Sequence, residues 1–303
     1  MGLNTLTHQV AIVTHYSSSI RLLFVLSTIV HIATVRTKCF EQKCMILDFK
    51  SQVDAFVFQY IPKHLIFLSM DNMLLEHLDQ TVMQTLPSFV THVDVRNSPA
   101  LKWIDVPNAT LNLTVLYTSV QRIDVVANSS VDYLMVTKCN LEKIPRTIQN
   151  AQRMRMLEMG SCKIDGLDMA SLCANRELTT VILTNNKIRY VVNTATQHCP
   201  IYDSLAALSL QANMLKTVNI ELFNVFVQLN SLFLHRNRIK SIAGRLVHDA
   251  LLQLRLENNK LTGLDMCHWH VPAIVLVTFM DNPMKTVPEC LNNLQNFSTI
   301  AGL

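Results

Sequence analysis

An unusual spacing of apolar residues is the feature that most restricts how this chain can fold. Residues 178–188, LTTVILTNNKI, follow the pattern L-x-x-V-x-L-x-x-N-x-I. That spacing is neither the strict alternation of a strand nor the 3.6-residue period of a helix. The pattern returns in four further segments, each containing an asparagine at the same place: Asn213, Asn237, Asn259 and Asn282. One such unit cannot bury its apolar side alone, so the chain is expected to stack similar turns on one another.

The series continues toward the N-terminus with other residues in place of the asparagine. Cys162 and Cys139 occupy this anchor position in their segments, and weaker copies have Thr118, Ser98 and Met73 there. The ten successive anchors are 20 to 27 residues apart. Both this interval and the pattern L-x-x-L-x-L-x-x-N/C-x-L are typical of leucine-rich repeats. The sequence therefore predicts an α/β solenoid, a leucine-rich-repeat horseshoe of about ten turns with a concave parallel β-sheet.

The anchors are expected to form a structural ladder inside the coil. An Asn amide or a Cys thiol can bond backbone groups that the bend of the chain leaves unpaired. The two cysteines of the ladder are predicted to be buried and reduced. We assign residues 61–290 to the solenoid, 39–60 to a cysteine-containing N-terminal cap and 291–303 to a short C-terminal tail. The predicted ladder comprises Cys139, Cys162, Asn186, Asn213, Asn237, Asn259 and Asn282.

The other six cysteines are predicted to form three disulfides. One pair follows its anchors by eight residues, and a second pair precedes its anchors by 13 and 14 residues. Equal positions on neighbouring turns place two side chains next to each other, which suits the Cα separation of a disulfide. The third pair lies in CFEQKC, where a bond would staple the cap over the first turn. The predicted bonds are Cys39–Cys44, Cys173–Cys199 and Cys267–Cys290.

The N-terminal region carries the pattern of a secretory signal. Arg21 precedes the apolar run LLFVLSTIVHIA at residues 22–33, and no acidic residue occurs before Glu41. A basic flank and a core of this length are typical of signal peptides, whereas twelve residues are few for a membrane span. We predict that residues 1–38 form an N-terminal extension and signal peptide, cleaved between Ala33 and Lys38, and that the chain is secreted with no stable membrane span. A buried helix or a signal anchor is the alternative.

Four N-glycosylation sequons support secretion. Three of them fall within 21 residues of one another, downstream of the signal-like start. The predicted sites are Asn108, Asn112, Asn128 and Asn296.

The sequence contains no recognisable catalytic or cofactor motif. Only six glycines occur, and no phosphate-binding glycine loop, H-E-x-x-H or G-x-S-x-G motif is present. The segment DMCHWH at residues 265–270 has three potential zinc ligands in near contiguity, a spacing that rarely gives a tetrahedral site. The net charge of +4 is too slight to indicate nucleic acid or an anionic membrane. We therefore expect no enzyme activity, no cofactor, no metal and no nucleic-acid partner.

The remaining candidate for function is the concave face. Side chains two and four residues before each anchor alternate with buried ones and should face the concave side of the sheet. In the most regular turns these positions carry aromatic and charged residues, a composition that suits a protein interface. A solvated sheet face without a partner is the alternative. The candidate binding residues are Gln211, Phe233, His235, Arg255 and Glu257.

The C-terminal turns resemble a known family. The chain begins with a C-x4-C cap and ends in LTGLDMCHWHVPAIVLVTFMDNPMKTVPECL, which is similar to the last repeats of the mosquito leucine-rich-repeat immune proteins. The stretch Leu264–Trp269 and the later Val287-Pro288 carry this resemblance, which covers most of residues 39–290. It implies a haemolymph protein of innate immunity. Members of that family stabilise or deliver a complement-like, thioester-containing protein.

The sequence departs from that family after the last repeat. The best-known members continue into further cysteines and a coiled coil that mediate disulfide-linked dimers, whereas thirteen residues follow Cys290 here, with no heptads. We expect a secreted binding protein, whose partner is a complement-like thioester protein or another leucine-rich-repeat chain. An intracellular or membrane-anchored leucine-rich-repeat scaffold is the alternative, and free thiols with an intact N-terminus would favour it.

Overall fold

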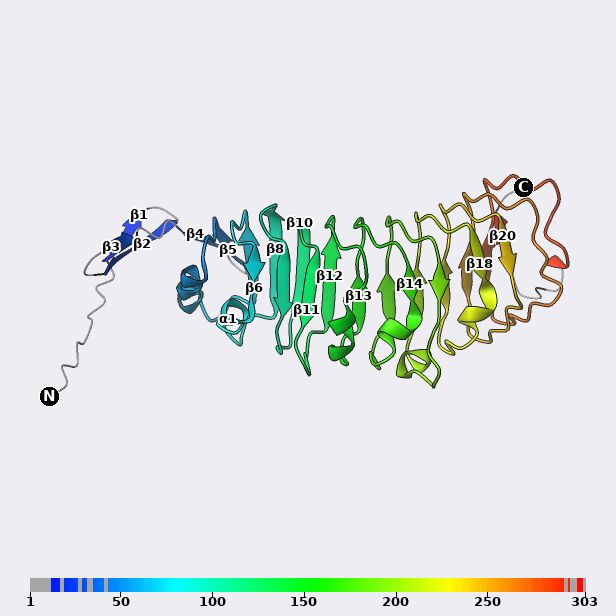
Figure 1. Cartoon of the computed structure of the whole chain (residues 1–303), viewed down its shortest axis with the longest axis horizontal. Helices are drawn as coiled ribbons and strands as arrows, with labels where there is room; N and C mark the ends of the chain where they lie inside the picture. Colours follow the sequence, from blue (N-terminus) through cyan, green and yellow to red (C-terminus); the bar gives the residue numbers. More distant parts are fainter. Residues whose placement is uncertain are drawn as a thin grey trace.

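The computed structural model has the predicted solenoid, built around one long sheet. It describes residues 12–16, 19–26, 29–31, 35–40, 43–291, 294 and 299–301. The long sheet has 13 strands, all parallel except β4, which pairs antiparallel with β5 at the N-terminal end. Figure 1 shows these strands stacked side by side along the length of the molecule. In spatial order they are β4 (Arg36–Cys39), β5 (Lys43–Leu47), β6 (Phe67–Asp71), β8 (His92–Ser98), β10 (Asn112–Thr118), β12 (Tyr133–Thr137), β13 (Met156–Glu158), β15 (Thr180–Ile182), β17 (Ala207–Ser209), β19 (Ser231–Phe233), β21 (Gln253–Arg255), β22 (Leu276–Thr278) and β23 (Thr299–Ala301).

The return path of each turn contains short strands and single helical turns. Three small parallel ladders run beside the long sheet: β7 (His77–Leu78) with β9 (Trp103–Val106) and β11 (Arg122–Val125), β14 (Leu167–Asp168) with β16 (Val191–Val192), and β18 (Thr217–Asn219) with β20 (Ser241–Ala243). One α-helix, α1 (Gln80–Met83), is described. The 3₁₀ helices are η1 (Gln52–Tyr60), η2 (Arg146–Asn150), η3 (Met169–Leu172), η4 (Pro200–Asp203) and η5 (Ile220–Phe223).

The two ends of the chain add strands where the sequence predicted a signal peptide and a tail. Strands β1 (Ile12–Tyr16), β2 (Ser19–Leu26) and β3 (Ile29–His31) form a separate antiparallel sheet. Figure 1 places this sheet beyond the N-terminal end of the solenoid. At the other end, β23 pairs parallel with β22 and extends the long sheet by one strand. Cleavage of residues 1–38 stays a prediction.

The apolar positions of the repeat form one continuous core. In the turn that contains LTTVILTNNKI, the side chains of Leu178, Val181, Leu183 and Ile188 are completely buried. The same positions are buried in the turns that follow, so a single hydrophobic cluster extends from Val35 to Leu294. Each such leucine contributes about 2 kcal/mol by removal from water, which explains why the motif repeats so strictly.

The asparagine anchors hold neighbouring turns together by hydrogen bonds. The Nδ2 of Asn237 donates to the carbonyl of Leu210 in the preceding turn at 2.9 Å and to that of Leu234 in its own turn at 3.0 Å. Its Oδ1 accepts from the backbone N–H of Leu215 at 3.1 Å. The other four asparagines of the ladder make equivalent contacts. The amide thus satisfies backbone groups that a tight bend would otherwise leave buried and unpaired.

A left-handed backbone residue precedes every anchor, which the sequence did not predict. The ten residues at this position have φ between 47° and 57°, and none of them is glycine. The backbone N–H groups of seven of them donate to a carbonyl of the next turn, as when Ala212 donates to the carbonyl of His235 at 3.1 Å. This bond offsets part of the steric cost that a Cβ atom brings in the left-handed region.

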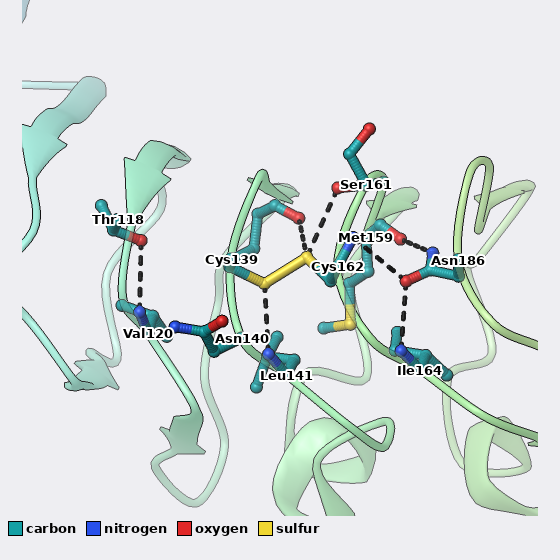
Figure 2. The surroundings of a disulfide bond; sticks show 12 residues. Thr118, Val120, Cys139, Asn140, Leu141, Met159, Ser161, Cys162, Ile164 and Asn186 are labelled. Carbon is teal, nitrogen blue, oxygen red and sulfur yellow. Dashed lines mark hydrogen bonds between the residues drawn. A yellow bond between two sulfur atoms is a disulfide. The ribbon is translucent and has the colours of Figure 1, made fainter.

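The prediction that Cys139 and Cys162 are reduced is wrong, because the two residues form a disulfide. Both are buried anchors, as predicted, but they lie on neighbouring turns with their Cα atoms 4.7 Å apart, which is within disulfide range. Figure 2 shows the bond joining two successive rungs of the ladder, between Thr118 on one side and Asn186 on the other. The equal-position argument used for the other cysteines applies equally to this pair.

The structure also contains the three disulfides that the sequence predicts. The Cα atoms of Cys173 and Cys199 are 4.8 Å apart, as are those of Cys267 and Cys290. Cys39 and Cys44 face each other across β4 and β5. No cysteine in the described residues is free, and all eight are described.

The buried disulfide can be tested by peptide mapping. Digestion of the protein alkylated without reduction should yield a peptide pair linked through Cys139 and Cys162. Replacing both with alanine should lower the free energy of unfolding by about 3 kcal/mol, since the bond closes a loop of some two dozen residues in the unfolded chain. Alkylation of either thiol in the denatured, unreduced protein would contradict the assignment.

Candidate functional site

The concave face consists of three columns of side chains that alternate with the buried ones. The strand register places Ser209, Phe233, Arg255 and Thr278 side by side in the central column. A neighbouring column lies two residues further along the chain, just beyond the ends of β17, β19 and β21. It contains Gln211, His235 and Glu257. All five predicted binding residues therefore lie together near the C-terminal end of the sheet.

These residues differ in exposure, so they do not contribute equally to the surface. His235 and Glu257 are only 7% and 8% exposed, whereas the side chain of Arg255 is 42% exposed. Phe233 and Gln211 are half-buried. A partner would therefore meet the phenyl ring and the guanidinium first, above a floor formed by the imidazole and the carboxylate.

Glu257 is the centre of this group. Its carboxylate pairs with the guanidinium of Arg255 and accepts a hydrogen bond from the hydroxyl of Thr278, a residue outside the predicted set. The ring of Phe233 meets that of His235 edge-on, with the centroids 6.2 Å apart. The buried Nδ1 of His235 has no hydrogen-bond partner among the described residues. The aromatic and charged side chains are therefore held in one arrangement before any partner binds.

Burial and neighbouring charges decide the protonation of the pair. Burial lowers the pKa of His235, and the charges of Arg255 and Arg236 lower it further against the opposing effect of Glu257. Burial alone raises the pKa of Glu257, but the hydrogen bonds from Thr278 and Arg255 outweigh it and the net pKa is lowered. The surface thus presents a neutral imidazole beside an Arg–Glu ion pair at neutral pH.

A second polar and aromatic cluster lies at the N-terminal end of the concave face. Asp94 pairs with Arg96 at 2.6 Å and with Lys43 at 3.7 Å. The ring of His92 stacks on that of Phe67 with the centroids 4.3 Å apart. This cluster was not predicted because the early turns have weak anchors. Counting back from Ser98 as in the later turns does place Asp94 and Arg96 on the concave face, but not Phe67 or His92.

The middle of the concave face separates the two clusters. Six strand steps lie between β8 and β19, which corresponds to roughly 29 Å. This stretch carries Glu158, whose pKa is raised by burial, beside Tyr133, whose pKa burial and this carboxylate raise to about 12. The two clusters therefore lie too far apart to contact each other directly.

The predicted glycosylation sites differ in accessibility. Asn108 and Asn128 are exposed on the return path of neighbouring turns. Asn112 begins β10 and is half-buried, and its side-chain amide contacts the Nε2 of His92 at 3.0 Å. Asn296 lies outside the described residues.

Among the described residues, one group of side chains could offer ligands to a metal. Asp265, Cys267 and Glu289 have ligand atoms within 4.8 Å of one another. The sulfur of Cys267 is bonded to Cys290, so it cannot act as a thiolate ligand and only two carboxylates remain. Within the described segments, no helix has the length and apolar character needed to cross a membrane.

Comparison with known proteins establishes the fold. No protein-family model matches the sequence. No curated protein matches it either. The solved TLR13-ssRNA13 complex matches with a TM-score of 0.53 and 15% identity over 77% of this chain and 38% of the TLR13 chain. The LRIM1 leucine-rich repeat domain matches with a TM-score of 0.52 and 15% identity, covering 87% of this chain and 76% of that domain.

The chain folds as a leucine-rich-repeat solenoid. It spans well under half of the TLR13 chain's length. At this level of identity the comparison concerns the fold, and the choice of partner depends on the outward-facing residues of this chain.

The lowered pKa of His235 predicts a pH dependence of stability. The unfolded chain takes up a proton near pH 6.5 and the folded chain only at lower pH, so stability is lost as the pH falls from 7.5 to 5.5. The free energy of unfolding should decrease less over this range in His235→Gln than in wild type. The difference between the two slopes should be at most about 1.4 kcal/mol per pH unit. Urea denaturation at the two pH values measures this difference. His268→Gln, at an exposed position, is the control and should behave as wild type.

Proposed function

We propose that this protein is a secreted leucine-rich-repeat recognition protein of innate immunity that engages a protein partner through the C-terminal part of its concave face. The observation that carries the proposal is the arrangement of Phe233 and Arg255 above the buried pair His235 and Glu257. Aromatic and arginine side chains contribute most to protein interfaces when neighbouring groups hold them rigidly. Here the Glu257 carboxylate orients the guanidinium, and the His235 ring contacts the phenyl ring.

Secretion is supported by the cysteines and the sequons. Four disulfides account for all eight cysteines, a usage typical of proteins that mature in an oxidising compartment. The signal-like start and the exposed positions of Asn108 and Asn128 agree with passage through the secretory pathway.

The immune role rests on the resemblance of the C-terminal turns to the mosquito leucine-rich-repeat immune proteins. That resemblance implies two kinds of partner, a complement-like thioester protein or another leucine-rich-repeat chain. Both are large folded proteins. A concave face with two polar clusters roughly 29 Å apart suits a partner of that size better than a small molecule.

The binding surface is tested by a double substitution. Immobilised wild-type protein should capture a complement-like thioester protein or a second leucine-rich-repeat chain, and Phe233→Ala with Arg255→Ala should weaken capture about tenfold or more. The melting temperature should stay close to that of wild type, because both side chains are partly exposed.

The matched control removes an aromatic and an arginine from other surfaces. Tyr60→Ala with Arg153→Ala changes exposed residues outside the concave sheet and should leave capture as in wild type. Undiminished capture by the Phe233 and Arg255 variant would place the binding site elsewhere on the molecule.

Secretion is tested by mass spectrometry of protein recovered from the medium of expressing cells. We expect an N-terminus between Ala33 and Lys38, glycans on Asn108 and Asn128, and four disulfides. Retention of the intact N-terminus with free thiols would instead indicate an intracellular or membrane-anchored scaffold.

A further inference from the structure

One flank of the solenoid is formed by the residues directly after each anchor. The residue two places after the anchor is buried in the core, so the residues one and three places after it point outward, as Lys187 and Arg189 do on either side of Ile188. Backbone hydrogen bonds stack these positions on successive turns: the N–H of Arg189 donates to the carbonyl of Asp165 at 3.0 Å, and the N–H of Lys240 donates to that of Lys216 at 2.8 Å. Each flank position therefore forms a column with a regular spacing.

In the last six turns these columns are strongly basic. Of the twelve outward positions after the anchors from Cys162 to Asn282, eight are Lys or Arg, whereas the whole chain has 26 basic residues among 303. The single acidic residue, Asp165, pairs with Arg189 at 3.3 Å. Ion pairs of the other seven cations are absent from the described part of the chain. This basic flank comprises Lys163, Lys187, Arg189, Lys216, Arg238, Lys240, Lys260 and Lys285.

The flank has the dimensions of a linear binding site. Along the chain, its residues in four of the six turns come shortly before strands β14, β16, β18 and β20. The flank belongs to the green-to-red part of the solenoid in Figure 1. Five steps between neighbouring turns give a length of roughly 24 Å. Each column has a cation in four of its six turns, and every one of the six turns has a cation in at least one column. All eight side chains are exposed, and the backbone ladder keeps their spacing regular.

We propose that this basic flank binds a linear sulfated polysaccharide. Such a polymer carries negative charges at regular intervals along an extended chain, which complements two parallel columns of cations. Six of the eight cations are lysines, which act as point charges and suit repeated charge–charge contacts. The concave surface that contains Phe233 and Arg255 is a different face, so both ligands could be held at once.

Other polyanions fit the flank less well. Single-stranded nucleic acids are usually held by aromatic side chains that stack on the bases, and none of the twelve outward positions is aromatic. The exposed aromatic residue closest in the sequence to a flank position is Tyr190, which follows Arg189. An anionic membrane would favour a large apolar side chain able to insert between lipids, and the twelve positions contain only Met214 and Pro283 as apolar residues.

The test uses heparin as the sulfated probe and fully desulfated heparin, which keeps only its carboxylates, as the counterpart of low charge density. Wild type should bind heparin with an affinity that decreases as salt increases, and it should bind the desulfated polymer at least about tenfold more weakly. Lys187→Gln, Lys216→Gln, Lys240→Gln and Lys260→Gln together should weaken heparin binding about tenfold or more at about 0.15 M salt. Lys216→Gln with Lys240→Gln alone should give an intermediate loss.

A control with the same loss of charge separates the flank from the net charge. Lys50→Gln, Lys63→Gln, Arg153→Gln and Arg176→Gln remove four exposed cations outside the basic flank and should leave heparin affinity within about twofold of wild type. Equal weakening by both sets would overturn the proposal, as would tighter binding to single-stranded RNA than to heparin. Capture of the protein partner serves as an independent readout and should be unchanged in the flank variant.

Discussion

The hydrogen-bonded asparagine at the bend of each turn is the interaction on which the rest of the structure depends. Its amide donates to carbonyls of two successive turns and accepts from a backbone N–H of the preceding turn, as Asn237 shows. A bend tight enough to stack the turns leaves these groups facing the core, where unpaired groups would each cost about 1–3 kcal/mol. Where two neighbouring anchors are cysteines, a disulfide joins the turns instead.

The ladder fixes the spacing of everything outside it. Each turn repeats the path of the preceding turn, displaced by the distance between two neighbouring strands. Outward residues at one position of the repeat therefore form a straight column with a regular spacing. The concave columns hold an ion pair and aromatic rings near the C-terminal end, and the flank columns hold lysines and arginines. Two chemically different surfaces therefore arise from the same repeat, a few residues apart in the sequence.

Much of this could be predicted from the residues alone, for a physical reason. Buried positions must be apolar and anchors must be able to bond backbone, so Leu183, Asn186 and Ile188 identify their places directly. Counting from the anchors also gave two of the disulfides and the position of Phe233 and Arg255. The disulfide between Cys139 and Cys162 was not predicted, because each cysteine was assigned to the ladder without considering that the other lies on the neighbouring turn. The left-handed residue before each anchor was missed because Asn, Ala, Arg and Ser all occupy it, so composition gives no signal there.

The sequence by itself determined that the chain coils and which residues lie inside the ten turns with a recognisable anchor, because burial imposes a strict choice of side chain at each inward position. It did not reveal that β5 and β23 also join the parallel sheet. Only the tertiary structure decided which outward residues become neighbours. Arg238 and Lys260 are 22 residues apart in the chain yet lie on adjacent turns, and so do Arg255 and Thr278, which are 23 residues apart. A net charge of +4 gave no hint of a basic flank, because acidic residues elsewhere cancel it in the total. Electrostatic attraction depends on distance in space, and the stacking of the turns sets that distance.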